Sequence, residues 1–262
     1  MKKGGFLLLS LFLFFLLADS AFSDEITENL QSILIEKFDN PNPDPEAKDE
    51  RPWIVQASKF RTIVRDPNDP EKIVEEFPKV AYVASIAQAL HREPPEGVTY
   101  RSLGIHGRFD RKADNFIELI PAKKAEDGSL VPNPILLPGR VKNMDIWIWG
   151  SNYDYYLEAH LLDYRGINHV MKFGSIKYKG WKNLRVNVPR GIPQAVVYAP
   201  NLKGLKLVKF VIWTKPGERV EDFRVYFDEF KIFTDMFESL FDGEDLANPK
   251  KIDQLWSETA SN

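Results

Sequence analysis

The chain contains no cysteine, so it has neither a disulfide framework nor a cysteine nucleophile. It also lacks an excess of basic residues: 35 Lys and Arg stand against 38 Asp and Glu, which gives a formal net charge of −3. Nucleic-acid binding relies on a basic surface that neutralises phosphates. The composition therefore predicts no nucleic-acid partner, and a fold held by a hydrophobic core without disulfides.

Common catalytic motifs are missing as well. The sequence has no Gly-rich phosphate loop followed by Lys, no H-E-x-x-H and no G-x-S-x-G. None of the four histidines has a partner at metal-ligand spacing; they are His91, His106, His160 and His169. These absences argue against the commonest nucleophilic and phosphate-binding sites and against a histidine-based metal centre.

Carboxylates are plentiful, which keeps a glycoside-cleaving enzyme open as one hypothesis. That chemistry needs two acids facing each other across a sugar. Glu158 and His160 alternate along the chain and would share a strand face, either for acid–base work or as part of a solvated surface. Spacing singles out no pair among the candidate acids, which are Glu118, Glu158, Asp163 and Asp228.

Two short acidic patches lie near the ends of the folded region. They are Asp228-Glu229 in the last predicted strand and Glu36 to Asp39 in the first. They resemble the strand ends of carbohydrate-binding jelly rolls, some of which hold a structural Ca²⁺ through oxygen ligands. Ordinary charges at a sheet edge are the alternative interpretation.

Only one long apolar run occurs, and it lies at the N-terminus. Lys2 and Lys3 precede the apolar run 6–18, and Ala21 and Ser23 are the small residues that signal peptidase requires. We therefore predict that residues 1–23 are a secretory signal, cleaved between Ser23 and Asp24. No later run is apolar enough to span a bilayer, so the mature chain is expected not to be a membrane protein.

The central stretch, residues 142–189, has the pattern of an antiparallel sheet. Ile146 and Ile148 alternate with Trp147 and Trp149, and a Gly-Ser-Asn turn signal follows. Similar alternation, interrupted by Pro, Gly, Asn and Asp clusters, predicts strands elsewhere. The expected segments are 33–38, 53–64, 73–77, 103–109, 116–120, 153–162, 171–178, 181–188, 205–214 and 223–233.

These strands predict an all-β fold, a β-sandwich of jelly-roll type with short helical additions near the termini. Residues 80–89 fit either a strand or a short helix. The last strand shifts phase between Phe227 and Phe230, which indicates a β-bulge. We expect a single domain over residues 24–235 and a helical tail over 236–262.

The aromatic residues are the most informative candidates for a functional surface. Trp147, Trp149, Tyr153 and Tyr156 lie in or beside the central strands. On a concave sheet such rings would stack on sugars, on a flat face they would suit protein contacts, and facing inward they would belong to the core. The sequence leaves these three alternatives open.

The order of motifs resembles the spirochaete flagellar filament outer-layer (sheath) protein family, FlaA. The central match comprises Trp147-x-Trp149-Gly150, residues 162–166 (LDYRG) and Gly180-Trp181-Lys182 leading to Val188-Pro189. Residues 102–110 upstream and residues 226–231 (YFDEFK) downstream are similar to the same family. Together these motifs cover most of the mature chain.

The resemblance implies an exported, non-enzymatic protein of the periplasm that coats flagellar filaments. It also implies that the chain has no catalytic residue and no cofactor. Its expected partners are the flagellin core filament, other sheath proteins and further copies of itself. A repeating coat needs a contact on its surface, and the predicted contact residues are Trp147, Trp149, Tyr153, Tyr156, Met236, Phe237, Leu240, Phe241 and Trp256. A secreted carbohydrate-binding jelly-roll module is the alternative function.

Overall fold

The fold is all-β. The computed structural model describes residues 29–43, 48–194, 204–236, 252 and 256–257 of the chain. Within these residues it contains fifteen strands and one short 3₁₀ helix, η1 (Gln88–Leu90), and residues 252, 256 and 257 are also helical. No helix among them has the length or the apolar character that crossing a membrane requires.

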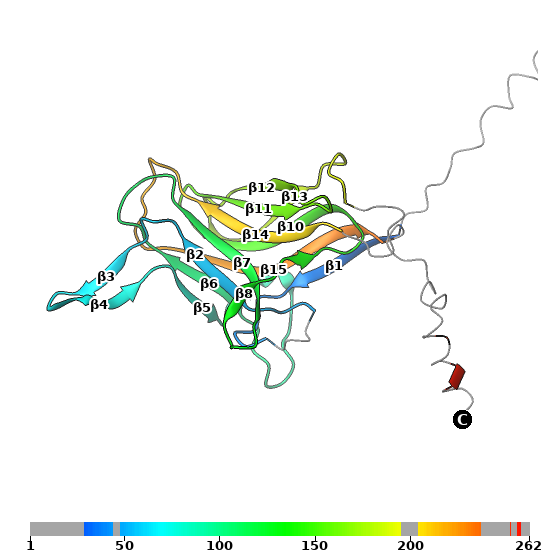
Figure 1. The fold of residues 1–262 in the computed structure, drawn as a ribbon, viewed down its shortest axis with the longest axis horizontal. Coiled ribbons are helices and arrows are strands. Elements are labelled where there is room, and N and C mark those ends of the chain that lie inside the picture. Colours follow the sequence, from blue (N-terminus) through cyan, green and yellow to red (C-terminus); the bar gives the residue numbers. More distant parts are fainter. Residues whose placement is uncertain (1–28, 44–47, 195–203, 237–251, 253–255, 258–262) are drawn as a thin grey trace, which may run out of the picture.

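Most strands form two antiparallel sheets that pack face to face (Figure 1). We call them sheet I and sheet II. Sheet I has the order β13 (Lys179–Asn187), β10 (Arg140–Ser151), β15 (Phe223–Asp235), β6 (Ser102–Gly107) and β5 (Lys79–Val83), with β1 (Leu30–Glu36) paired to β15.

Sheet II has β12 at one edge and β2 at the other. A separate two-stranded hairpin, β3–β4, protrudes from the sandwich at the left of Figure 1. The order in sheet II is β12 (Asn168–Ser175), β11 (Tyr156–Leu162), β14 (Lys206–Trp213), β7 (Phe116–Lys124) and β2 (Trp53–Ala57), with β8 (Leu130–Pro132) on β7 and β9 (Ile135–Leu136) on β14; the hairpin joins β3 (Ile63–Asp66) to β4 (Asp69–Glu76).

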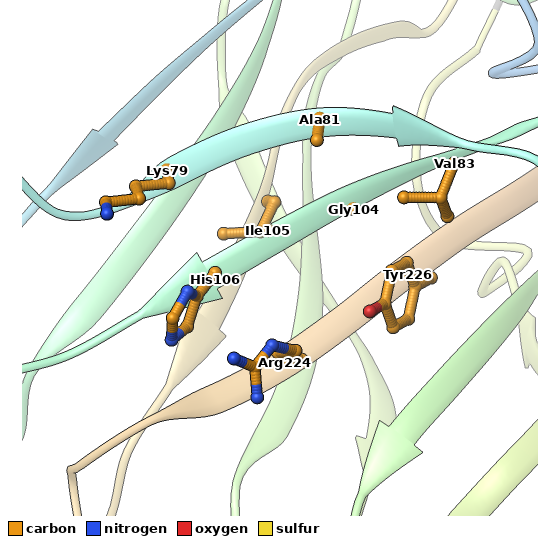
Figure 2. A pocket seen from close by; sticks show the side chains of 8 residues that line it. All are labelled: Lys79, Ala81, Val83, Gly104, Ile105, His106, Arg224 and Tyr226. Atoms are coloured by element: carbon orange, nitrogen blue, oxygen red, sulfur yellow. The ribbon is translucent and has the colours of Figure 1, made fainter.

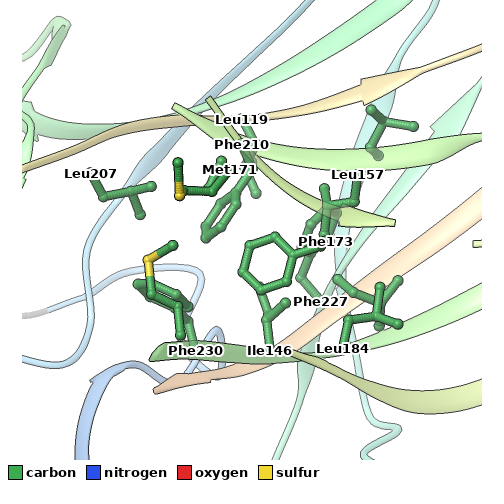
Figure 3. Close-up of a cluster of buried hydrophobic side chains, with 14 of the residues drawn as sticks. Leu119, Ile146, Leu157, Met171, Phe173, Leu184, Leu207, Phe210, Phe227 and Phe230 are labelled. Atoms are coloured by element: carbon green, nitrogen blue, oxygen red, sulfur yellow. The ribbon is translucent and has the colours of Figure 1, made fainter. Parts of the chain in front are cut away.

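The core fills the space between the two sheets (Figure 3). Phe210 of sheet II meets Phe230 of sheet I edge to face, with ring centroids 5.2 Å apart, and it lies 6.3 Å from Phe227. All three rings are fully buried. They are inward-facing because alternate residues of a strand point to the same side of its sheet. Burial of such rings is the main stabilising term of the sandwich.

The predicted fold class is confirmed, although several strand boundaries differ. Segment 53–64 was expected to form one strand but divides into β2 and β3, because β2 pairs with β7 whereas β3 pairs with β4. The ambiguous segment 80–89 forms β5 and then η1. Segment 121–138, which none of the predicted strands covers, contributes the end of β7 as well as β8 and β9.

The predicted bulge in the last strand is present. The pairing of β10 with β15 shifts register between Asp228 and Phe230, and the extra residue, Glu229, takes a positive φ of 35°. The extra residue lets Phe227 and Phe230 both face the core although three residues separate them. The helical tail expected after residue 235 lies almost wholly outside the described residues.

Candidate functional site

A row of aromatic rings crosses the outer face of sheet I. Trp149 lies opposite Trp181 of β13 on one side and opposite Tyr226 of β15 on the other. Paired residues of neighbouring strands point to the same face, and the Trp149 and Tyr226 rings meet at 79° with centroids 5.2 Å apart. All three rings are half-buried, as is Trp147 on the same face. The predicted alternation of Trp147 and Trp149 with the buried isoleucines is therefore confirmed.

The row ends in a hollow over β5 and β6 (Figure 2). Gly104 lies opposite Tyr226, and a Cβ at Gly104 would be only 2.7 Å from the ring atom Cε1. The tyrosine ring thus occupies the space that any side chain at Gly104 would need. The hollow has a volume of about 300 Å³ and is lined by Lys79, Ala81, Val83, Gly104, Ile105, His106, Arg224 and Tyr226.

Ion pairs surround this hollow. Lys79 Nζ lies 2.7 Å from Glu75, and His106 Nε2 lies 2.6 Å from Asp222 Oδ1, which is also 3.1 Å from Arg224. The hydrogen bond from His106 lowers the pKa of Asp222, and the one from Lys79 lowers the pKa of Glu75. Because Lys79 and Arg224 each face a carboxylate, the rim offers polar groups with little net charge. Sequence reasoning missed the hollow, which exists only once β5, β6 and β15 lie side by side.

The acidic patches of the first and last strands are brought together beneath the segment that follows β5. Arg92 lies among three carboxylates, 3.4 Å from Asp39, 3.3 Å from Asp228 and 3.3 Å from Glu229. Burial removes Asp228 from water and raises its pKa to about 7, although the positive charge of Arg92 opposes this shift.

A second arginine, Arg51, pairs with Glu36, the buried acid of β1. Arg51 Nε donates to Glu36 Oε2 at 2.8 Å, and the backbone N–H of Phe38 donates to Glu36 Oε1 at 3.0 Å. Burial nevertheless raises the pKa of Glu36 to about 7. The residues that the structure describes include no group of three or more His, Asp or Glu arranged to hold a metal ion. Arg92 and Arg51, together with Lys231, which pairs with Glu229, supply the positive charge in this acidic cluster.

The two tyrosines predicted as contact residues have different environments. Tyr153 is only 8% exposed; its hydroxyl donates to the carbonyl of Glu221, and Arg219 lies 4.0 Å from its ring centroid. Tyr153 is therefore a core residue, and its hydrogen bond holds the segment before β15 in place. We do not include Tyr153 in the proposed contact surface. Tyr156 is half-buried on the outer face of sheet II, opposite Trp213.

The acids considered for glycoside cleavage all have structural partners. Glu158 accepts a hydrogen bond from Trp213 Nε1 at 2.9 Å and shares a face with His160, as predicted, at 3.5 Å. Asp163 accepts two backbone N–H groups of its own turn, and the others pair with cations: Glu118 with Lys209 and Asp228 with Arg92.

Little of the tail is described. Met236 is half-buried, and its backbone N–H donates to the carbonyl of Asn29 at 2.8 Å. Trp256 is helical and 77% exposed. The remaining predicted tail contacts, Phe237, Leu240 and Phe241, lie outside the described residues.

Comparison with known families matches most of the chain to a described family. The family described as flagellar filament outer layer protein FlaA matches residues 77–241, which run from the end of β4 into the tail. A flagellar filament outer layer-like protein of Brachyspira hyodysenteriae is 25% identical over 114 residues. That alignment covers 44% of this chain and 53% of the relative, so the chain spans about half the length of the relative it matches.

Solved structures with a similar arrangement include two carbohydrate-binding modules. The family 11 module of a cellulosomal cellulase of Clostridium thermocellum has a TM-score of 0.39 at 9% identity, covering 79% of this chain and 96% of the module. TmCBM61, solved with β-1,4-galactotriose, has a TM-score of 0.35 at 14% identity, covering 70% and 88%. At these scores the likeness supports no inference about what this chain binds.

Proposed function

Because the chain belongs to the FlaA family of flagellar filament outer layer proteins, we propose that it is a structural subunit of the outer layer of a periplasmic flagellar filament. The observation that carries this proposal is the family match over residues 77–241. The matched region contains most of both sheets, including the aromatic row. In this role the chain contributes to filament shape and stiffness, and hence to motility.

The proposal includes export and assembly without catalysis. Residues 1–23 direct the chain to the periplasm and are removed before Asp24. The mature chain then binds the flagellin core filament and other sheath proteins. Support for a non-enzymatic role comes from the carboxylates, since the acids considered for catalysis already bind backbone N–H groups, an indole or cations.

The half-buried rings of sheet I are the proposed contact surface. Trp147, Trp149 and Trp181 remain partly accessible although they are large and apolar. Protein interfaces are enriched in aromatic residues of this kind. A sheet face with such rings can lie along a filament without a deep cleft.

The experiment that tests the proposal is mass spectrometry of isolated periplasmic flagella before and after mild acid or detergent stripping. We expect the chain to co-purify with filaments and to be released as a stoichiometric layer. A deletion strain should carry thinner filaments in electron micrographs, and complementation should restore their diameter. Abundance in the periplasm together with absence from filaments would refute the proposal.

Carbohydrate binding is a second candidate function, favoured by the hollow beside the aromatic row. It combines the Tyr226 ring with ion-paired donors and acceptors on Arg224, Asp222 and His106. An aromatic face with nearby polar groups suits a neutral sugar ring. Calorimetric titration with neutral oligosaccharides should detect binding that Tyr226→Ala abolishes. No heat change with any oligosaccharide tested would count against this candidate.

A further inference from the structure

One edge of the sandwich is strongly basic. No Asp or Glu occurs between residues 164 and 217. This stretch includes β12 and β13, which are the edge strands of sheets II and I at the same end of the molecule. The strands and their flanks carry six exposed cations: Lys172, Lys177, Lys179, Lys182, Arg185 and Arg190. We call this surface the basic edge.

Most of this positive charge is not neutralised within the described part of the chain. Lys177 lies 3.4 Å from Asp154, and Lys172 lies 3.9 Å from Glu158. Among the described residues, no ion pair involves the other four cations, which are Lys179, Lys182, Arg185 and Arg190. The basic edge is therefore open to an acidic partner.

The β3–β4 hairpin has the opposite charge. Residues 63–76 contain five carboxylates but only two cations, Arg65 and Lys72. The hairpin pairs only with itself and leaves both outer strand edges without a neighbouring strand among the described residues. Unpaired strand edges are ready to add a further strand. Its five carboxylates belong to Asp66, Asp69, Glu71, Glu75 and Glu76. Asp66, Glu75 and Glu76 form ion pairs with Lys72, Lys79 and Arg61, so the carboxylates open to a partner among the described residues are the exposed Asp69 and Glu71.

Both surfaces also expose aliphatic side chains. On the hairpin, Ile73 is 47% exposed and Val74 is 57% exposed. At the basic edge, Ile167 and Val170 are 52% and 44% exposed. A contact between the two surfaces would therefore bury apolar side chains as well as bring opposite charges together.

The two surfaces lie at opposite ends of the sandwich. The hairpin connects β2 to β5, and these are the edge strands of sheets II and I that lie farthest from β12 and β13. Figure 1 shows the hairpin protruding away from the β12 and β13 labels. Complementary surfaces at opposite ends of one chain produce an open, repeating, head-to-tail array.

We propose that the acidic β3–β4 hairpin of one copy docks on the basic β12–β13 edge of the next copy. This inference rests on the proposed function, because it specifies how subunits of an outer layer join one another. Charge selects the partner surface, the four aliphatic residues supply apolar contact, and the free strand edges supply backbone donors and acceptors.

Sedimentation of the purified mature chain, residues 24–262, tests the contact over a range of concentrations. We expect self-association that weakens as salt rises, because the attraction between exposed charges is screened. Lys179→Glu/Lys182→Glu and Asp69→Lys/Glu71→Lys should each weaken association by at least about tenfold, since each variant places like charges face to face. A 1:1 mixture of the two variants should restore association, because each reversed surface then meets its opposite.

Lys123→Glu/Lys124→Glu is the matched control, with the same charge change on exposed residues outside both surfaces. Circular dichroism should show that all variants are folded. Three results would each overturn the inference. The wild-type chain stays monomeric, either charge-reversed variant associates as well as wild type, or the mixture of the two variants does not recover association. Co-purification with filaments is measured separately. If the chain binds filaments but fails the association tests, only the docking inference is overturned. If the chain passes the association tests but is absent from filaments, only the proposed function is overturned.

Discussion

At the scale of single residues, two glycines of β6 leave space that aromatic rings of β15 occupy. A Cβ at Gly104 would clash with Tyr226 on the outer face, and a Cβ at Gly107 would lie 2.0 Å from Cζ of Phe223 on the inner face. Phe223 is fully buried and stacks against Phe109 at 6.0 Å. The ring cannot retreat from a new methyl group without disturbing its neighbours.

We therefore predict that Gly107→Ala destabilises the protein by about 1–3 kcal/mol, the usual cost of overpacking a core. Chemical denaturation monitored by fluorescence would measure the change. Gly191→Ala is the matched control, because no atom lies within 4 Å of its Cβ position. Equal stabilities of the two variants would contradict the reading of Gly107 as a packing requirement.

At the scale of elements, the turn between β11 and β12 depends on one carboxylate. Asp163 Oδ1 accepts the backbone N–H groups of Arg165 at 2.8 Å and Ile167 at 3.0 Å, and Oδ2 lies 2.9 Å from His169 Nε2. The hydrogen bond from His169 lowers the pKa of Asp163. This turn positions β12 beside β11, and β12 forms part of the basic edge.

Asp163→Ala should loosen this turn, because its amides lose their acceptor. Hydrogen exchange of Arg165 and Ile167 is expected to accelerate by at least about tenfold, as in local opening. Asp163→Asn keeps an oxygen acceptor and should change exchange much less. If Ala and Asn accelerate exchange equally, the charge of Asp163, and not its acceptor geometry, holds the turn.

At the scale of the whole molecule, two buried acids give stability a pH dependence. Burial raises the pKa of Asp228 from 3.8 to about 7 and that of Glu36 from 4.5 to about 7. Between these values the folded state holds protons that the unfolded state releases. The free energy of unfolding from these groups is therefore highest at low pH and falls as pH rises towards 7.

We predict that Asp228→Asn reduces this decline, because an amide of the same shape carries no charge to desolvate. Thermal midpoints measured between pH 4 and pH 8 should fall less steeply in the variant than in wild type. The exposed residue Glu126 provides a control, Glu126→Gln, which should leave the slope unchanged. Parallel curves for wild type and Asp228→Asn would show that Asp228 is not a source of the pH dependence.

The sequence by itself determined the local properties of the chain. Alternation of Ile146 and Ile148 with Trp147 and Trp149 predicted a strand with one buried face, and the phase shift before Phe230 predicted the bulge. These properties follow from the geometry of neighbouring residues along one strand. The ordered motifs likewise pointed to the family that the comparison shows.

Only the tertiary structure decided which strands lie side by side, because strand pairing joins residues far apart in the chain. Pairing of β6 with β15 created the hollow at Gly104, and folding placed Tyr153 in the core, apart from the half-buried rings of sheet I. The sheet order put β12 and β13 at one end and the β3–β4 hairpin at the other. The sequence alone shows that the hairpin is acidic and that the β12–β13 segment is basic. Where these two segments lie relative to each other depends on hydrogen bonds and burial between residues far apart in the chain.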